Sequence, residues 1–186
     1  MRIIGGARRG LKLADVGEGD MAAHLRPTSD RVREAIFNLL INAHGNPVAG
    51  ARVLDLFAGT GALGLESLSR GASEATFVDD GAKALALIRA NVAKMRAEGE
   101  TQVLRQDVRR LGPNPGAGYG LVFLDPPYGK GLGEAALAAA LKGGWLASQA
   151  MVVWEEGSAV TAPEGFALID QRKYGDTIVT LLKAPE

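Results

Sequence analysis

Residues 52–64 read Arg-Val-Leu-Asp-Leu-Phe-Ala-Gly-Thr-Gly-Ala-Leu-Gly, and this stretch decides the fold. Apart from Arg52 and Asp55, the run 52–57 is apolar and predicts a buried strand. Gly59, Gly61 and Gly64 follow at the spacing G-x-G-x-x-G, and a helix is expected over 62–70. Glycine at these positions lets a ligand approach the backbone and lets the helix pack close to the strand. The stretch is therefore typical of an α/β fold that binds a ligand at the end of a strand.

The alternation of strands and helices continues from this stretch toward the C-terminus. Further strands are expected at 75–79, 101–105, 121–124 and 151–154, and further helices at about 82–97 and 132–141. The last two runs, 167–173 and 176–183, read as a closing antiparallel pair with Gly175 at the turn. Because such alternation produces parallel strands joined by crossover helices, we predict an open, doubly wound α/β sheet.

The first 49 residues have a different character. Residues 3–4 and 11–13 could be two short strands joined by a glycine-rich turn, and a helix is expected over about 28–42. We therefore expect a small N-terminal extension over 1–49, a short hairpin plus a helix, attached to a larger domain over 50–186.

Composition narrows the possible functions. The chain has no cysteine, which excludes disulfides and thiolate metal sites, and its two histidines lie far apart, so no metal is expected. No apolar run approaches the ~20 residues that a membrane span needs. The N-terminus becomes polar too quickly for a signal peptide, so we expect a cytoplasmic protein with no membrane partner.

Positive charge is local rather than general. Lys plus Arg and Asp plus Glu both total 21, so the chain has no overall basic field for nucleic acid. The first twelve residues nevertheless carry Arg2, Arg8, Arg9 and Lys12 with no acidic residue. This cluster is a candidate RNA-binding patch, and a merely solvated surface is the alternative interpretation.

Two acidic residues accompany the glycine loop. Asp79 ends the second predicted strand, where it is placed to accept hydrogen bonds from the two hydroxyls of a ribose. The loop and Asp79 together fit either a dinucleotide or S-adenosylmethionine, and do not separate them. Asp55 lies inside an apolar strand and needs a partner, because burying an unpaired carboxylate is costly. That partner is either an amino group of the cofactor or nearby N–H groups of the loop.

The tetrapeptide Asp125-Pro126-Pro127-Tyr128 closes the fourth predicted strand. Its two prolines remove backbone donors and stiffen the chain, so the turn becomes a rigid set of acceptors beside a carboxylate. Such a turn suits an NH₂ group, and Tyr128 offers a flat face on which a base can stack. Acceptors on both amino hydrogens would push the nitrogen lone pair out of the ring plane, toward an incoming methyl group. We therefore predict that these four residues position the exocyclic amino group of a nucleic-acid base.

With these motifs the sequence resembles the class I S-adenosylmethionine-dependent methyltransferases, and more narrowly the bacterial 16S rRNA guanine-N2 methyltransferase family (RsmD type). The narrower resemblance covers most of the chain and depends on four segments, Arg2–Gly6 with Gly10, Arg26–Phe37, Gly61–Glu66 and Lys173–Thr177. It implies a Rossmann-like fold whose mostly parallel seven-stranded sheet has a C-terminal antiparallel strand. It also implies a cofactor site formed by Asp55, Phe57, Gly59, Thr60, Gly61, Asp79, Asp107, Val108 and Asp125.

The same resemblance implies roles in catalysis and RNA binding. Asp107 would meet the adenine amino group of the cofactor, and Asp125 and Tyr128 would hold the target base. Arg26, Thr28 and Arg31 would lie near the active site or the RNA. One departure weakens the ribose assignment: the family often has Glu-x-Asp after the second strand, where this chain has Asp79-Asp80-Gly81.

The expected function is therefore transfer of a methyl group from S-adenosylmethionine to a guanine N2 in 16S rRNA, presented by a small-subunit ribosomal particle to a monomeric enzyme. An adenine-N6 methyltransferase acting on DNA or RNA is the nearest alternative, because adenine also carries an exocyclic NH₂. A nicotinamide-dependent oxidoreductase could use the same glycine loop, but the Asp-Pro-Pro-Tyr segment has no role there. A catalytically inert RNA-binding module would not need the cofactor residues.

Overall fold

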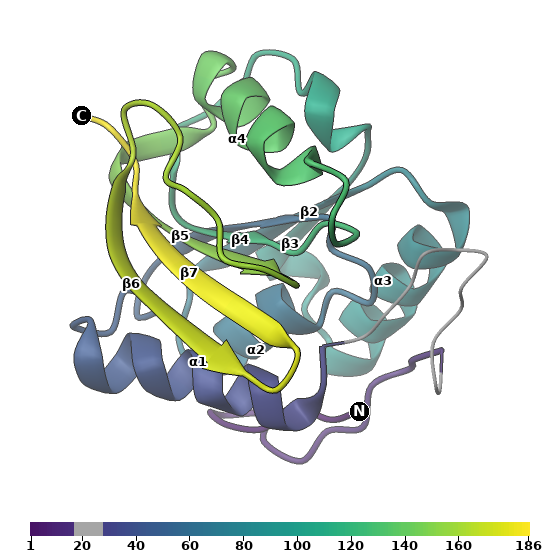
Figure 1. The fold of residues 1–186 in the computed structure, drawn as a ribbon. Helices are drawn as coiled ribbons and strands as arrows, with labels where there is room; N and C mark the ends of the chain where they lie inside the picture. Colours follow the sequence, from purple (N-terminus) through teal and green to yellow (C-terminus); the bar gives the residue numbers. More distant parts are fainter. Residues whose placement is uncertain (17–27) are drawn as a thin grey trace.

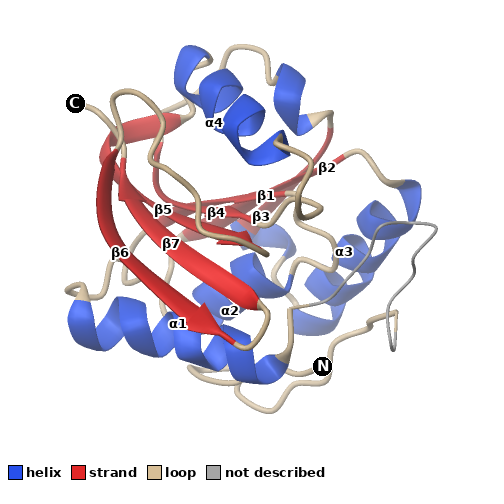
Figure 2. Cartoon of the chain, in the orientation of Figure 1, coloured by secondary structure: helices blue, strands red, loops and turns tan. Residues whose placement is uncertain are grey.

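The computed structural model describes residues 1–16 and 28–186, so Arg26 lies outside the described residues. The helices are α1 (Asp30–Ala43), α2 (Ala62–Ser69), α3 (Ala82–Met95) and α4 (Leu132–Lys142), with short 3-10 helices η1 (Glu98–Glu100) and η2 (Val108–Arg110). The strands are β1 (Arg52–Leu56), β2 (Glu74–Asp79), β3 (Thr101–Arg105), β4 (Tyr119–Leu124), β5 (Leu146–Glu156), β6 (Ala167–Tyr174) and β7 (Thr177–Lys183). One sheet separates α4 from α1, α2 and α3, which gives three layers (Figures 1 and 2).

The sheet has the order β3-β2-β1-β4-β5-β7-β6. Strands β1 to β5 are parallel, and β7 is antiparallel to both of its neighbours, β5 and β6. The mostly parallel seven-stranded sheet expected from the sequence is therefore confirmed, as is its C-terminal antiparallel strand. Strand order reverses between β1 and β4, and ligands of open α/β sheets bind outside the carboxyl ends of the strands at such a point. The glycine loop follows β1 and Asp125 follows β4, so both segments lie at this point.

Two apolar cores lie on the two faces of the sheet, because successive side chains of a strand point to opposite faces. Val53 and Phe123 pack with Phe37 of α1 and Leu65 of α2. Their neighbours along the strands belong to a second core, beneath α4, which contains Leu54, Val122, Leu124 and Leu137. The strands therefore read as continuous apolar runs, as expected for a sheet covered on both faces.

The N-terminal hairpin is smaller than the sequence suggested. Residues 3–4 and 11–13 do not form strands; a single antiparallel bridge joins Arg2 to Lys12. Gly6 and Gly10 have positive φ angles of 76° and 87°, which bend the chain and prevent a longer ladder. Ile3 and Leu13 enter the core that contains α1 and α2, while Arg2 and Lys12 remain exposed.

Two predicted strands begin earlier in the structure. β4 begins at Tyr119 rather than 121, and β5 extends over Leu146–Glu156 rather than 151–154. The added part of β5 pairs Leu146 with Tyr119 across an irregularity in the ladder, which breaks the simple apolar pattern. Within residues 1–16 and 28–186, no helix is both long and apolar enough to cross a membrane.

Candidate active site

Two cavities open beside the carboxyl ends of the strands. One, here called the loop cavity, has a volume of about 390 Å³ and is bordered by the glycine loop and the ends of β1 and β2. The other, here called the base cavity, has a volume of about 600 Å³ and lies between the start of α1, the turn after β4 and the β6–β7 hairpin. Thr28, Asp125 and Pro127 line both cavities, so the two spaces meet at these residues.

The glycine loop forms one wall of the loop cavity. Gly59 and Gly61 have positive φ angles of 58° and 77°, a conformation that side-chain-bearing residues rarely adopt. A Cβ atom at Gly64 would lie 2.4 Å from the ring of Phe77 in β2, so this glycine allows α2 to pack directly on the sheet. Gly59 lines the cavity, and Gly64 allows the close helix packing that the spacing predicted.

Phe57 connects β1 to this loop in a strained conformation. Its φ angle of 58° is unusual for an aromatic residue, and a left-handed backbone costs roughly 1–2 kcal/mol for a residue with a Cβ atom. Backbone strain of this kind clusters at ligand-binding sites, where the surrounding structure enforces it. Phe57 lines the loop cavity, where it presents an apolar face.

Asp79 ends β2 and orders the loop. Its Oδ2 accepts a hydrogen bond from the Gly59 N–H at 3.0 Å, and its Oδ1 accepts one from the Gly81 N–H at 2.9 Å. Burial raises the pKa of the Asp79 carboxyl, and these backbone donors partly offset the shift. A carboxylate has about four acceptor positions, so Asp79 keeps acceptor capacity for a ligand in the cavity.

Asp55 and Asp107 also line the loop cavity, and each already has a partner in the chain. Asp55 is 1% exposed, and its Oδ2 accepts from the Gly64 N–H at 3.0 Å in the first turn of α2. Burial raises the pKa of Asp55 well above its usual range. Asp107 is bonded to Arg109 through both oxygens, at 3.0 and 2.8 Å, and this pairing lowers the pKa of Asp107. Thr60 and Val108 line this cavity as predicted, whereas Gly61 does not line it.

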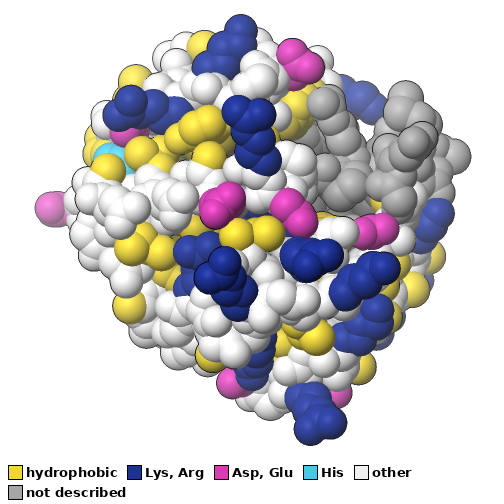
Figure 3. Space-filling view, turned by 90° about the horizontal axis from the view of Figure 1, so that it is seen from below, with side chains coloured by type: hydrophobic (Ala, Val, Ile, Leu, Met, Phe, Trp, Pro, Cys, Tyr) yellow, Lys and Arg dark blue, Asp and Glu magenta, His cyan; other side chains and the backbone are white. Residues whose placement is uncertain are grey.

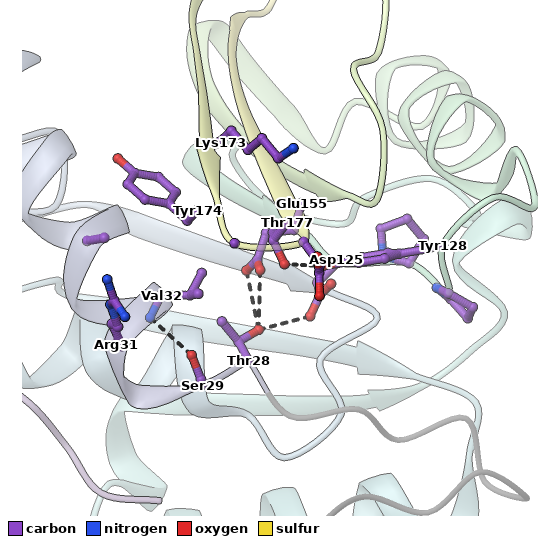
Figure 4. Close-up of a pocket in the computed structure, with 15 residues that line it drawn as sticks. Thr28, Ser29, Arg31, Val32, Asp125, Tyr128, Glu155, Lys173, Tyr174 and Thr177 are labelled. Carbon is purple, nitrogen blue, oxygen red and sulfur yellow. Dashed lines mark hydrogen bonds between the residues drawn. The ribbon is translucent and has the colours of Figure 1, made fainter.

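Acidic, aromatic and basic side chains line the base cavity (Figure 4). They are Asp125 and Glu155, Tyr128 and Tyr174, and Arg31 and Lys173. The Thr28 hydroxyl lies 3.2 Å from Asp125 Oδ2 and 3.4 Å from both oxygens of Glu155, at the end of β5. Tyr128 lies beside the same floor, and its hydroxyl is 3.1 Å from Thr177 Oγ1 in β7. That bond fixes the tyrosine ring against the β6–β7 hairpin. Pro126 and Pro127 line the cavity between Asp125 and Tyr128.

Comparison with known proteins identifies the family. The model of the family described as "Conserved hypothetical protein 95" matches residues 1–183. The chain belongs to this family. A relative from Escherichia coli strain K12, named "Ribosomal RNA small subunit methyltransferase D", is 37% identical over 185 residues, which are 97% of this chain and 88% of the relative. YlbH of Bacillus subtilis is 35% identical and covers 98% of each chain.

A solved structure shows the same fold. The Escherichia coli protein yhhF superposes with a TM-score of 0.83 at 35% identity, over 100% of this chain and 98% of that one. The class I methyltransferase fold and the methyltransferase family expected from the sequence are both confirmed. In this chain the segment Lys173–Thr177 supplies one wall of the base cavity, a role that the sequence motif alone did not indicate.

Two acidic residues of this family member were missed by sequence reasoning. Glu155 follows the apolar run 151–154, and an acid at the end of a buried strand is a signal that could have been used. Glu66 lies in the Gly61–Glu66 segment but received no role. It is fully buried and accepts hydrogen bonds from the Ile4 and Gly5 N–H groups, both at 2.8 Å. It therefore attaches the N-terminal segment to α2.

The residues expected to bind RNA are only partly brought together. Thr28 and Arg31 line the base cavity, whereas Arg2, Arg8, Arg9 and Lys12 line neither cavity. Arg8 is half-buried and pairs with Glu100 at 3.0 Å, so part of its charge is neutralised within the chain. Lys and Arg side chains gather on the face seen in Figure 3, with a few acidic side chains between them.

Metal-binding side chains do not cluster at this site. In the part of the chain that the structure describes, histidine, aspartate and glutamate nowhere form the groups of three or more that could hold a metal ion.

Proposed function

We propose that this protein transfers a methyl group from S-adenosylmethionine to the exocyclic N2 of a guanine in the 16S rRNA of the small ribosomal subunit. The observation that carries the proposal is the meeting of two cavities at Asp125, since a methyl donor in one and a base in the other would be adjacent there. Family membership and the name of the Escherichia coli relative support rRNA as the substrate.

The loop cavity has the chemistry that an adenosine-bearing cofactor requires. Asp79 would accept hydrogen bonds from the ribose hydroxyls, the loop at Gly59 and Gly61 would face the methionine part, and Asp107 would accept from the adenine amino group. Phe57 and Val108 offer apolar surface to the adenine ring. When bound, S-adenosylmethionine supplies an electrophilic methyl group.

The residues of the base cavity would prepare the nucleophile. Asp125 and the carbonyl of Pro126 accept from the two amino hydrogens, which localises the lone pair on nitrogen and aims it at the loop cavity. Tyr128 stacks on the base, and the two prolines keep the acceptors rigid. Asp125 is also placed to take the proton that the amino group loses when the N–C bond forms. Catalysis would then come mainly from positioning.

Recognition of the RNA would depend on local charge and on shape. The chain has a net charge of zero, which gives weak affinity for free RNA because phosphate contacts supply most non-specific binding. We therefore propose that residues 1–49 form an RNA-contacting extension, with Arg2, Arg9, Lys12 and Arg31 exposed toward phosphates. A ribosomal particle that holds the target base out of its stack would lower the cost of reaching Tyr128. We expect a cytoplasmic monomer.

We expect the protein to bind S-adenosylmethionine rather than a nicotinamide cofactor. Calorimetry should show binding of S-adenosylmethionine or its demethylated product and no binding of NAD. Asp79→Ala should weaken that binding by about 2–3 kcal/mol, roughly 30- to 150-fold, because hydrogen bonds to a charged acceptor are lost. Glu98→Ala, an exposed change outside both cavities, is the control. Because the pKa of Asp79 is raised, wild-type affinity should fall with decreasing pH before an ordinary aspartate would protonate. Tight NAD binding would contradict the assignment.

The substrate itself can be tested with three acceptors. Methyl incorporation is measured with naked 16S rRNA, with small-subunit particles that lack the modification, and with duplex DNA. We expect strong preference for the particles, and mass spectrometry of nucleosides should identify N2-methylguanine. Labelled N6-methyladenine, or DNA methylated as well as the particles, would favour the adenine alternative instead.

A further inference from the structure

Glu155 is a buried acid that the steps described above do not use. It lies at the end of β5, is 1% exposed, and lines the base cavity together with Asp125 and Tyr128. Within the described residues its hydrogen-bond partner is the Thr28 hydroxyl, which also faces Asp125. A hydroxyl has one proton and can donate to only one of these carboxylates at a time. Glu155 therefore retains acceptor capacity toward the cavity, and burying such a group is costly unless a ligand uses it.

The chemistry of the two possible target bases shows what this acceptor could do. Guanine and adenine each carry an amino group next to the ring nitrogen N1, so a site that holds only the amino group cannot separate them. The difference lies at N1, which bears a hydrogen in guanine and a lone pair in adenine. Discrimination therefore requires a second polar group beside the one that holds the amino nitrogen.

Glu155 occupies that position relative to Asp125. The Thr28 hydroxyl is within 3.4 Å of both carboxyl groups, so the two acids are neighbours on one cavity floor (Figure 4). We propose that Glu155 accepts the N1–H of the target base while Asp125 holds its amino group, so that Glu155 selects guanine over adenine. This inference rests on the proposed function, because it assumes that a guanine N2 is methylated.

The ionisation of Glu155 gives the selection a pH dependence. Burial raises the pKa of Glu155 well above its usual range, and the nearby Asp125 and Asp55 add to the shift. The Thr28 hydroxyl and the Arg33 guanidinium of α1 act in the opposite direction, and the paired residue of β7 is the apolar Val179. The ionised acid accepts from guanine N1–H, whereas the protonated acid can donate to adenine N1. Preference for guanine should therefore rise with increasing pH.

The test uses small-subunit particles in two forms. Product analysis with the wild-type enzyme first identifies the methylated guanine, and particles are then reconstituted with adenine at that position. Initial rates give a guanine-to-adenine ratio for each enzyme. Glu155→Gln should lower this ratio by about tenfold to a hundredfold, because an amide can donate to adenine N1 and accept from its amino group. The ratio should also lose its dependence on pH.

A matched control is available one residue away. Glu156 does not line the base cavity, and its Oε1 accepts from the Gly129 and Gly157 N–H groups at 3.0 and 2.8 Å. A glutamine can keep both bonds, so Glu156→Gln should preserve the base ratio and its pH dependence. Thr28→Val tests whether Glu155 acts only by holding Thr28, in which case both variants would change the ratio equally and the inference would be wrong.

The outcomes separate the two levels of the proposal. Wild-type enzyme that makes N6-methyladenine and no N2-methylguanine would overturn both the proposed function and this inference. Wild-type enzyme that makes N2-methylguanine, with a base ratio unchanged by Glu155→Gln, would overturn the inference alone. If Glu155→Gln fails to fold, the pH dependence of the guanine-to-adenine ratio of the wild-type enzyme tests the inference. A ratio that does not rise with pH contradicts selection of guanine by Glu155.

Discussion

Asp125→Ala should reduce methyl transfer to small-subunit particles on the order of a thousandfold, as is typical when a preorganised group at the reacting atom is removed. The carboxylate lies where the loop cavity and the base cavity meet, and its Oδ2 is 3.2 Å from the Thr28 hydroxyl. Without it the amino group would lose an acceptor that aims its lone pair and takes its proton. The loss should therefore appear in kcat, measured under saturating S-adenosylmethionine.

A conservative change tests this interpretation of Asp125. Asp125→Asn keeps one acceptor oxygen in place but no charge, so we expect an activity between those of wild type and Asp125→Ala. Both variants should bind the demethylated cofactor within about tenfold of wild type, because the glycine loop and Asp79 are unchanged. Asp125→Ala enzyme that retains a tenth or more of wild-type kcat would show that the carboxylate is not a catalytic residue.

The sequence predicted structure correctly where a segment's conformation depends only on its own residues. The strand at 52–57, the three glycines and the Asp-Pro-Pro-Tyr turn each follow from local stereochemistry, and the structure places them as expected at one edge of the sheet. Asp79 was also locatable, because it ends β2 next to β1, and ligands of open α/β sheets bind outside the carboxyl ends of the strands. Local patterns were therefore sufficient for the fold and for part of the cavity lining.

Residues whose partners lie far along the chain could not be assigned in this way. Glu155 meets Thr28 across 127 positions, and no local pattern brings these two residues together. Asn91 of α3 is similar: its side chain bonds both Ala14 and the Thr60 carbonyl, and so joins the N-terminal segment to the glycine loop. The prediction of short strands at 3–4 and 11–13 was wrong for a local reason. Gly6 and Gly10 have positive φ angles, and this bending of the chain outweighs the β propensity of the neighbouring residues.

Glu66→Ala should lower the free energy of unfolding by about 3–5 kcal/mol, the usual cost of breaking a buried ion pair by removing one partner. Glu66 is fully buried, and its carboxylate pairs with Arg70 Nε at 2.7 Å and with the buried Arg33 Nε at 3.5 Å. It also accepts the Ile4 and Gly5 N–H groups. The alanine variant would leave two guanidinium groups and two backbone donors without this carboxylate. Urea denaturation monitored by circular dichroism measures the change.

Glu74→Ala is the matched control for this prediction. Glu74 pairs with Arg52 at 2.6 Å, but 43% of its side chain is exposed, and surface pairs contribute at most about 1 kcal/mol.

Hydrogen exchange adds a local readout, because the Ile4 and Gly5 amides should exchange much faster in Glu66→Ala even where the sheet stays protected. Loss of this attachment would release the segment that carries Arg2, Arg9 and Lys12, so affinity for the particle should fall more than affinity for the cofactor. A Glu66→Ala protein as stable as Glu74→Ala, with slow exchange at both amides, would mean that other contacts hold the extension on α2.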